Sequence, residues 1–292
     1  MISIIASDMD GTLLNDKMEI SPENTAAIKK AQAAGIEFIV ATGRGLSEAQ
    51  PLLNQVGLDP AYITLNGAQV FNTAGQLVVN EPLTDRMAKQ LATELRAQGF
   101  YFELVTNRGV YSESKVRRIQ NVADLLVNLN PDTTYKIAVA LAAARLEIMN
   151  INYVDNYDQL LNDRDFQIMK ILVFSSEGPD TFVPIRQKYI DDQEIVITSS
   201  SPNNIEINSI KAQKGLALLD YAKQKNISAD QVMAIGDNMN DYSMITAAGV
   251  GVAMGNAIPA IKQVATFTTA TNIKNGVAQA IDWALMQNSM QK

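Results

Sequence analysis

The chain has 292 residues, 47% of them hydrophobic and 19% charged, a composition typical of soluble globular proteins. A single core rarely grows beyond about 250–300 residues, so two domains are expected. The 31 acidic residues outnumber the 24 basic ones, for a formal net charge of −7, which disfavours nucleic-acid binding. Cysteine and histidine are both absent, which excludes disulfides, thiolate zinc sites and every histidine-dependent mechanism and leaves proton transfer to carboxylates, lysine or tyrosine.

Membrane association is not expected from the sequence. The apolar stretch 137–144 ends at Arg145 after eight residues, whereas a membrane span needs roughly 20. The first residues carry no basic segment, and Asp8 interrupts their apolar run, so no signal peptide is predicted. We expect a cytoplasmic protein, and the sequence leaves its oligomeric state open.

The N-terminal segment predicts a strand–helix–strand unit. Residues 2–7 form a short apolar run, typical of a strand buried on both faces of a parallel sheet. Ser21 and Pro22 mark a helix start and Gly35 marks its end. A second apolar strand is predicted over 36–41, followed by a further strand and an Asn-Gly turn at residue 66. This is a βαβ unit of an α/β fold.

A similar alternation of helices and strands is predicted near the C-terminus. The sequence predicts helices over 215–226, 240–248 and 276–286 and strands over 232–235 and 250–253. We therefore predict a doubly wound, mostly parallel, Rossmann-like α/β core made of residues 1–83 and 210–292.

The segment between these halves reads as α+β. Helices are predicted over 86–98, 115–128 and 180–189, and strands over 100–106, 110–111, 167–174, 194–198 and 204–208. We assign residues 84–209 to an inserted α+β cap domain that selects the substrate. The stretch 130–165 gives the weakest pattern.

Polar residues follow three predicted core strands. Asp8 and Asp10 follow the first strand, Thr42-Gly43-Arg44 follow the second, and Gly236-Asp237-Asn238 follow a late one. Ligands in open α/β sheets bind beyond the carboxyl ends of the strands, so these residues should converge if the strands are neighbours.

The convergence predicts a metal site. Asp8, Asp10, Asp237 and Asp241 cannot share a small volume without a cation or protonation. Mg²⁺ suits such an oxygen-only site. We predict Asp8 and Asp237 as carboxylate ligands, a main-chain carbonyl near Asp10 as a further ligand, and Asp241 as a group that orients them.

A phosphate site is predicted beside the metal. Lys214 precedes a predicted helix start, where an ammonium is unfavourable against the helix dipole unless an anion binds there. Thr42 and the amide of Gly43 could donate to the same phosphate. A carboxylate such as Asp8 can attack phosphorus, and Asp10, two residues on, could protonate the leaving oxygen and then activate water.

Other residues have two readings. Arg44 and Asn66 could contact phosphate or the cap, but an Arg–carboxylate pair within the core and an asparagine in a tight turn explain them equally well. Lys170 could face the site or snorkel to solvent. Four methionines are interpreted as core filling: Met233, Met239, Met244 and Met254.

Two other motifs are rejected. In a calcium-binding EF-hand the glycine is sixth and a helix precedes the loop, whereas Gly11 is fourth and follows a strand. The run Gly43-Arg44-Gly45 lacks the third glycine of a dinucleotide-binding fingerprint.

Taken together, the motifs resemble those of the haloacid dehalogenase-like phosphatases. The matching segments, in chain order, are Asp8-Met9-Asp10-Gly11-Thr12, Ala41-Thr42-Gly43-Arg44, Lys214-Gly215 and Gly236-Asp237-Asn238-Met239-Asn240-Asp241. Further similar segments are Asn66-Gly67-Ala68, Val252-Ala253-Met254-Gly255-Asn256-Ala257 and Gly276-Val277-Ala278. The chain is most similar to the Cof-type branch (subclass IIB), whose α+β cap is inserted between the second and third motifs.

The resemblance implies a Mg²⁺-dependent phosphatase acting on small phosphorylated metabolites such as sugar, flavin or pyridoxal phosphates. It implies that Asp8 is the nucleophile, Asp10 the acid/base, and Asp237 a metal ligand. By the same resemblance Thr42 and Lys214 bind phosphate, and Asn240 and Asp241 position lysine, phosphate or metal. Asn275 departs from the pattern, since family members often carry aspartate there.

Two alternatives stay open at this point. A sugar phosphomutase uses the same motifs and differs in isomerising its substrate faster than it loses phosphate to water. A non-catalytic sensor of phosphorylated metabolites has little use for Asp10 beside Asp8.

Overall fold

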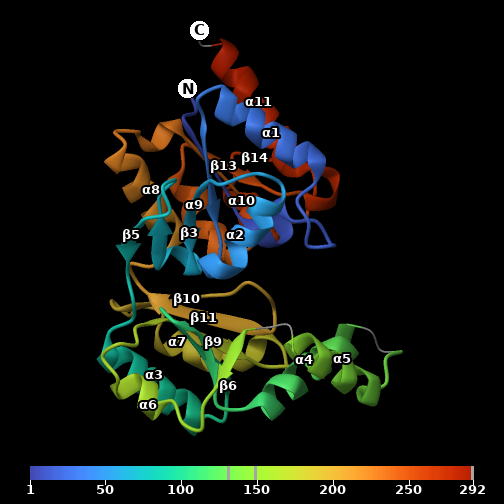
Figure 1. Cartoon of the computed structure of the whole chain (residues 1–292), viewed down its shortest axis with the longest axis vertical. Helices are drawn as coiled ribbons and strands as arrows, with labels where there is room; N and C mark the ends of the chain where they lie inside the picture. The colour runs from blue at the N-terminus through green and yellow to red at the C-terminus, as the bar shows by residue number, and fades with distance from the viewer. Residues whose placement is uncertain (130–131, 148–149, 291–292) are drawn as a thin grey trace. The chain divides into compact units, whose positions relative to one another are not determined.

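The computed structural model describes residues 1–129, 132–147 and 150–290. The chain divides into two compact units, which we call the core unit (Met1–Glu81 with Lys211–Lys292) and the cap unit (Pro82–Ile210). Figure 1 shows the elements of each unit. The inserted segment therefore spans 82–210, compared with the 84–209 expected from the sequence.

Pro82, Leu83 and Ile210 thus belong to the cap unit rather than to the core, and hydrogen bonds explain the placement of Leu83 and Ile210. Leu83 donates its backbone N–H to the carbonyl of Ile168 over 2.8 Å, and Ile210 donates to the carbonyl of Glu194 over 2.8 Å. Both acceptors belong to the cap unit, so both donors pair with that unit.

The core unit is built on one sheet with the strand order β14-β13-β12-β1-β2-β3-β4-β5. The strands from β14 to β3 are parallel, and β4 and β5 pair antiparallel at one edge. The strand bounds are β1 Ile4–Ser7, β2 Glu37–Ala41, β3 Ala61–Thr64, β4 Gln69–Phe71, β5 Leu77–Asn80, β12 Val232–Gly236, β13 Val250–Ala253 and β14 Phe267–Thr268.

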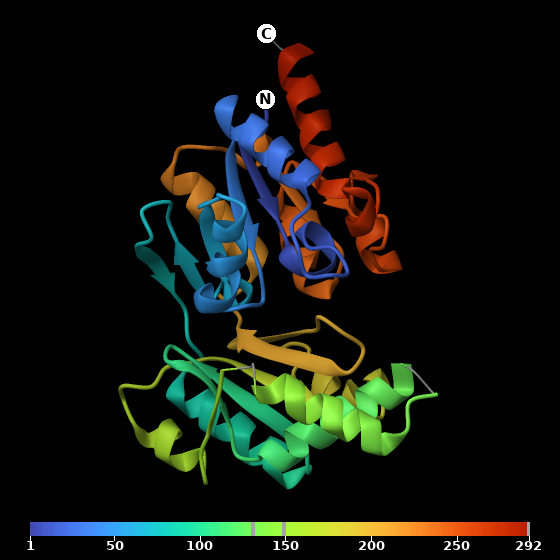
Figure 2. The same cartoon turned by 45° about the vertical axis from the view of Figure 1, so that its right-hand side comes forward.

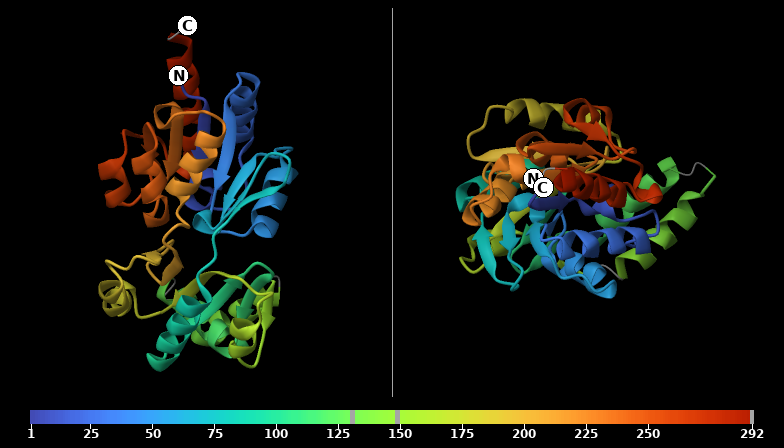
Figure 3. Two further views of the ribbon diagram at one scale, coloured as in Figure 1. Left: turned by 90° about the vertical axis from the view of Figure 1, so that its left-hand side faces the viewer. Right: turned by 90° about the horizontal axis from the view of Figure 1, so that it is seen from above.

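Helices cover both faces of this sheet. Their bounds are α1 Pro22–Ala33, α2 Leu46–Gln55, α8 Lys214–Gln224, α9 Tyr242–Ala247, α10 Pro259–Val264 and α11 Gly276–Met290. In Figure 3, α1 and α2 lie on one face and α8 and α9 on the other, as right-handed crossovers require. Helix α11 runs beside α1 (Figure 2), where Lys30 Nζ and Asp282 Oδ1 form an ion pair of 2.9 Å.

The local sequence explains these elements. All four residues of β1 are buried, as expected for a strand covered on both faces. Helix α1 begins with Pro22, and the Ser21 hydroxyl accepts the N–H of Asn24 over 3.1 Å, which satisfies a donor that the helix leaves unpaired.

The cap unit contains a second sheet with the order β10-β11-β9-β6-β7-β8. Its strands pair antiparallel, except for the parallel pair β7 and β8. The bounds are β6 Tyr101–Thr106, β7 Gly109–Ser112, β8 Ile151–Tyr153, β9 Ile168–Phe174, β10 Ile195–Thr198 and β11 Asn204–Ser209. The helices are α3 Asp85–Ala97, α4 Lys115–Leu129, α5 Tyr135–Glu147, α6 Asp158–Asn162 and α7 Val183–Lys188.

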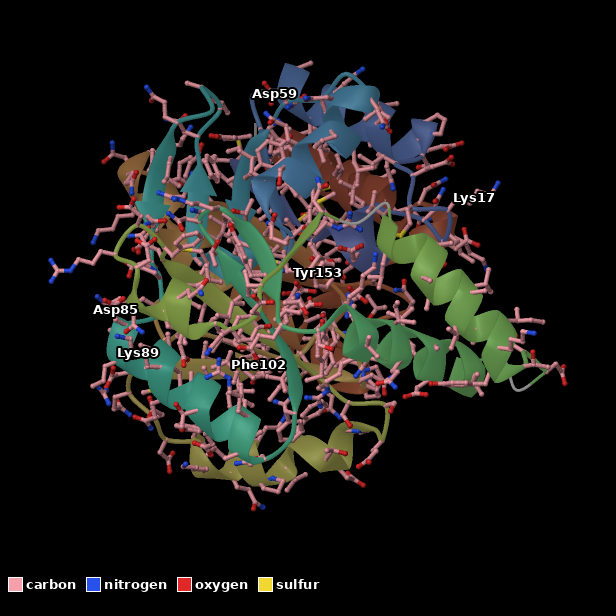
Figure 4. The ribbon with its side chains drawn as sticks, turned by 60° about the horizontal axis from the view of Figure 1, so that its bottom comes forward. Lys17, Asp59, Asp85, Lys89, Phe102 and Tyr153 are labelled. Carbon is pink, nitrogen blue, oxygen red and sulfur yellow. The ribbon has the colours of Figure 1, made fainter. Side chains whose placement is uncertain are left out.

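Alternation along the strands separates an apolar from a polar face of the cap sheet. Phe102 and Leu104 of β6 join the apolar cluster with residues of α3, whereas Glu103, between them, pairs with Arg118 over 3.2 Å. Figure 4 shows Phe102 on β6 and the exposed residues Asp85 and Lys89 on α3. Period-two alternation of this kind gives the sheet one packed face and one face for polar side chains.

The structure confirms the predicted α/β class and changes several details. Helices α2 and α5 were not assigned from the sequence, and Pro51 inside α2 interrupts the pattern that would have marked it. The segments 180–189 and 240–248 begin as 3₁₀ turns before they become helical.

Two side-chain interpretations were wrong. Met239 is 38% exposed, whereas Met233, Met244 and Met254 are buried as expected. Lys170 does not snorkel to solvent, because its ammonium pairs with the Glu206 carboxylate over 3.0 Å and both side chains are buried. No helix in the described part of the chain has the length and apolar character to cross a membrane.

Candidate active site

Three neighbouring core strands bring the predicted polar residues to one edge of the sheet. Strand β1 pairs in parallel with β12 on one side and with β2 on the other. Asp8 therefore leaves the sheet between Asp237, which follows β12, and Thr42, which follows β2. This is the edge at which open α/β sheets bind ligands.

Lys214 lies at the centre of the site. It is the first residue of α8, its side chain is fully buried, and its Nζ lies 2.6 Å from Asp8 Oδ1 and 2.6 Å from Asp241 Oδ1. A Cβ added at Gly215 would lie 2.2 Å from the Ser243 carbonyl oxygen. Because residue 215 is glycine, the start of α8 can pack closely against the segment that carries Asp241. This packing fixes the position of Lys214.

Asp241 orients the cluster. Its Oδ2 accepts the backbone N–H groups of Asp237 (2.9 Å) and Asn238 (3.1 Å), while its Oδ1 accepts from Lys214. Both oxygens of Asp241 are thus already used in hydrogen bonds, and its role in orienting metal ligands stays a prediction. A Cβ at Gly236 would lie 2.6 Å from the Asp241 side chain, so glycine is needed there.

Thr12 fixes the third carboxylate, a role that the sequence analysis did not assign. Its hydroxyl donates to Asp237 Oδ1 over 3.1 Å. Gly11, just before it, has φ +81°, and a Cβ there would lie 2.6 Å from Asp237 Oδ2. Glycine at position 11 therefore allows the positive φ of the turn and also leaves room for the Asp237 carboxylate. No local pattern in the sequence marks this role of Thr12, because its partner Asp237 lies 225 residues away.

Burial and neighbouring carboxylates raise the pKa of Asp8 and of Asp237. Burial is the largest cause for Asp8, whose pKa lies well above its usual value, and repulsion by Asp241 adds to it while Lys214 opposes it. Burial and Asp241 raise the pKa of Asp237 to about 7. Burial alone would lower the pKa of Lys214, but attraction to Asp241 and Asp8 raises it, so the lysine stays cationic.

This arrangement fits a divalent metal ion. Asp8, Asp237 and Asp241 each place one carboxylate oxygen within 4.8 Å of the others. Their charges exceed that of Lys214, and a hard cation relieves such a conflict. Because the oxygens of Asp241 are engaged, Asp8 and Asp237 are the residues whose oxygens suit the ion.

Asp10 lies apart from this cluster. Its carboxylate accepts from Arg44 Nε (2.8 Å) and Nη2 (2.6 Å), a two-pronged pair. The side chain of Asp10 is 49% exposed, whereas Asp8 is buried. Arg44 thus pairs with a carboxylate, but with a half-exposed one rather than within the core, and its contact with phosphate or the cap stays a prediction.

The predicted phosphate-binding groups lie around the same strand ends. Thr42 is fully buried, and its hydroxyl oxygen accepts the N–H of Arg44 over 3.1 Å, which orders the turn through Gly43. Asn66 has φ +60°, and its N–H donates to the Thr42 carbonyl over 3.0 Å. Asn66 thus has the backbone of a turn asparagine, and its contact with phosphate or the cap stays a prediction.

Asn240 is also buried beside the cluster. Among the residues that the structure describes, its Oδ1 has no hydrogen-bond partner. A buried amide oxygen without a partner is costly, and a bound ligand or its hydration would supply one.

The whole chain matches one protein family. The model of the haloacid dehalogenase-like hydrolases matches residues 5–281, and the chain belongs to this family. It is therefore an enzyme of the hydrolase class, and the resemblance stated from the motifs is confirmed.

Its relatives cover nearly all of its length. Phosphatase YwpJ of Bacillus subtilis is 33% identical over 95% of this chain and 98% of its own. The B. subtilis 5-amino-6-(5-phospho-D-ribitylamino)uracil phosphatase YcsE is 32% identical over 97% and 96%. A solved haloacid dehalogenase-like hydrolase from B. subtilis has a TM-score of 0.85 at 32% identity and covers 96% of this chain and 99% of that one.

Proposed function

We propose that this chain is a Mg²⁺-dependent phosphatase that hydrolyses small phosphorylated metabolites through an aspartyl-phosphate on Asp8. The observation that carries the proposal is the buried cluster in which Lys214 bridges Asp8 and Asp241 with Asp237 alongside. An excess of buried carboxylates at the carboxyl ends of parallel strands is suited to a cation and a phosphate together.

In the first step, an oxygen of Asp8 bonds to phosphorus while the bond from phosphorus to the leaving oxygen breaks. Asp10, once protonated and released from Arg44, gives its proton to that leaving oxygen. Lys214 keeps Asp8 in place, and its ammonium offsets negative charge at the reacting centre. The hydroxyl of Thr42 and the amide of Gly43 bind the phosphoryl oxygens.

In the second step, Asp10 takes a proton from water as the water oxygen bonds to phosphorus. The bond from phosphorus to Asp8 breaks, and inorganic phosphate leaves. Splitting the reaction in this way replaces one difficult step by two easier ones. Mg²⁺, held by Asp8 and Asp237, would neutralise phosphoryl charge when bound.

Substrate choice belongs, in this proposal, to side chains of the cap unit. The names of the relatives support phosphorylated metabolites as a class, including an intermediate with a ribityl chain. The particular metabolite requires experiment.

A phosphatase screen tests the proposal. Purified protein with Mg²⁺ is given sugar, nucleotide, flavin-precursor and pyridoxal phosphates, and released phosphate is measured beside an Asp8→Asn control. We expect release from at least one substrate class, no release after chelation of the metal, and no release by the variant. A protein that releases no phosphate from any of them contradicts the proposal, and faster isomerisation than release would identify a mutase instead.

A further inference from the structure

The turn that carries the catalytic pair is held from outside by three asparagine side chains. Residues 9–13 follow Asp8 and form an irregular turn, with non-helical backbone at Asp10 (ψ 115°) and Gly11 (φ +81°). Each asparagine donates its Nδ2 to a main-chain carbonyl of this segment: Asn256 to Gly11 (2.7 Å), Asn24 to Leu13 (3.3 Å) and Asn272 to Leu14 (3.0 Å). We call Asn24, Asn256 and Asn272 the asparagine clamp.

In two residues of the clamp, the side-chain oxygen Oδ1 is hydrogen-bonded as well. Asn256 Oδ1 accepts the N–H of Asn272 over 3.0 Å, and Asn24 Oδ1 accepts the N–H of Ala278 over 3.0 Å. An amide group with both its oxygen and its nitrogen engaged has one defined orientation. The Nδ2 donors are therefore aimed at the turn before any substrate arrives.

The clamp explains two sequence motifs that contain none of the proposed catalytic residues. Asn256 belongs to the run 252–257, which begins in β13, and Ala278 belongs to the run 276–278 at the start of α11. A Cβ at Gly255 would lie 2.8 Å from the N atom of Thr271. That close approach places Asn256 beside Asn272.

The turn benefits from such support because its backbone is irregular at Asp10 and Gly11. Leu13 donates to the carbonyl of Asp8 over 3.3 Å, and Leu14 donates to that of Met9 over 2.8 Å. The same turn places Thr12 on Asp237 and carries Asp10 two residues beyond Asp8. A shift of its carbonyls would therefore move the acid/base, the nucleophile and a metal-binding carboxylate relative to one another.

We infer that the asparagine clamp positions the Asp8–Asp10 turn for catalysis, with Asn256 and Asn272 as positioning residues of the reaction. The inference rests on the proposed phosphatase function. None of the three side chains contacts the carboxylates of Asp8, Asp10 or Asp237 through a hydrogen bond among the described residues. They act through the main chain alone.

Asn256→Ala is the informative variant, because Asn256 is exposed and its loss leaves no buried polar group behind. Asn288→Ala is the matched control. Asn288 makes the same two kinds of hydrogen bond to Ile2, at the opposite end of β1: Nδ2 to the carbonyl (2.7 Å) and Oδ1 from the N–H (2.7 Å). Each variant loses one asparagine side chain that forms hydrogen bonds with the main chain of the N-terminal segment.

Phosphate release from p-nitrophenyl phosphate with Mg²⁺ then separates positioning from a general structural role. We expect Asn256→Ala to lower kcat about tenfold, since small misplacements of reacting groups have effects of this size. KM should change less than about twofold, because Thr42 and Lys214 are untouched, and urea unfolding should resemble that of Asn288→Ala. Asn256→Ala combined with Asn272→Ala should lower kcat by less than the product of the single effects, since the two residues share a hydrogen bond.

A second readout does not depend on activity. Amide hydrogen exchange over residues 9–14 should be faster in Asn256→Ala than in the wild type and in Asn288→Ala. Equal kcat for the two variants, or a raised KM at unchanged kcat, overturns the inference. So does unchanged exchange over 9–14. A wild type without phosphatase activity overturns the proposed function instead, and the exchange experiment still decides whether the clamp fixes the turn.

Discussion

Among the residues that the structure describes, the buried carboxylates of the cap unit each face a cationic side chain, whereas those of the core unit outnumber the ammonium that they share. The cap pairs are Lys170 with Glu206 at 3.0 Å and Arg118 with Glu103 at 3.2 Å, with side chains at most 12% exposed. In the core, a single ammonium on Lys214 faces carboxylates on Asp8 and Asp241, with that of Asp237 close by.

The difference separates structural from functional charge. A buried pair with equal and opposite charges satisfies itself and needs no ligand. A buried cluster with surplus carboxylates opposes folding unless protons or a cation join it, and such clusters occur where a protein binds or reacts. The comparison predicts that core substitutions change activity most, whereas substitutions in the cap pairs change stability.

Loss of Lys214 should have the largest effect. Lys214→Met leaves Asp8 and Asp241 buried without their ammonium, so we expect phosphate release to fall at least about 10³-fold and the free energy of unfolding to fall by about 3 kcal/mol. Urea unfolding and phosphate assays measure both. Lys225→Met, which removes the exposed partner of Glu37, is the control, with about 1 kcal/mol or less at stake. Normal activity in Lys214→Met would refute the central role of this lysine.

Asp237→Asn should separate activity from stability. We expect at least about a 100-fold loss of Mg²⁺-dependent phosphate release. Burial and Asp241 raise the pKa of Asp237 to about 7, so its charge opposes folding at neutral pH, and the metal-free variant should be at least as stable as metal-free wild type. Asp282→Asn, at an exposed ion pair, serves as control. A clearly less stable variant would show that the core charges are balanced after all.

In the cap unit, breaking one ion pair should lower the free energy of unfolding. Lys170→Met leaves the Glu206 carboxylate without its ammonium, and we expect a loss of about 3 kcal/mol in urea unfolding. Replacing both residues by methionine should recover much of that loss. If the double variant is as unstable as the single one, the pair is not the structural unit described here.

The smallest effect is expected at Glu94 on α3. Burial would raise its pKa, but hydrogen bonds from Lys188 (2.6 Å) and Tyr189 (2.7 Å) outweigh burial and lower it. The folded pKa thus lies below the unfolded value of about 4.3. The stabilisation is therefore present above that value and is lost as pH falls through the folded pKa.

Urea unfolding of Glu94→Gln over a range of pH checks this sign. The variant should be about 1 kcal/mol less stable than wild type at neutral pH, and the two should converge in acid. A difference that grows on acidification contradicts the assignment.

Much of the core site was predictable because its residues follow strands whose apolar runs are local features. Asp8, Thr42 and Asp237 each end such a run, and parallel strands deliver their carboxyl ends to one edge. The role of Thr12 was not predictable, since it depends on the positive φ of Gly11 and on a partner 225 residues away.

Features of the cap unit were harder to predict from the sequence, because they also depend on distant partners. The pair of Lys170 and Glu206 joins neighbouring strands β9 and β11, and only the register of those strands brings the two side chains together. The middle of helix α5, residues 137–144, is apolar at every position, so its sequence shows no one-sided periodicity to mark it. Pairing between distant segments, rather than local pattern, decides these features.

Trapping the covalent intermediate tests the central claim most directly. Wild-type protein with Mg²⁺ is mixed with p-nitrophenyl phosphate, quenched and treated with borohydride, which reduces an acyl phosphate to an alcohol. Peptide mass spectrometry then locates the reduced residue. We predict homoserine at position 8 and none at positions 10, 237 or 241. Steady phosphate release with an unmodified Asp8 would contradict the account.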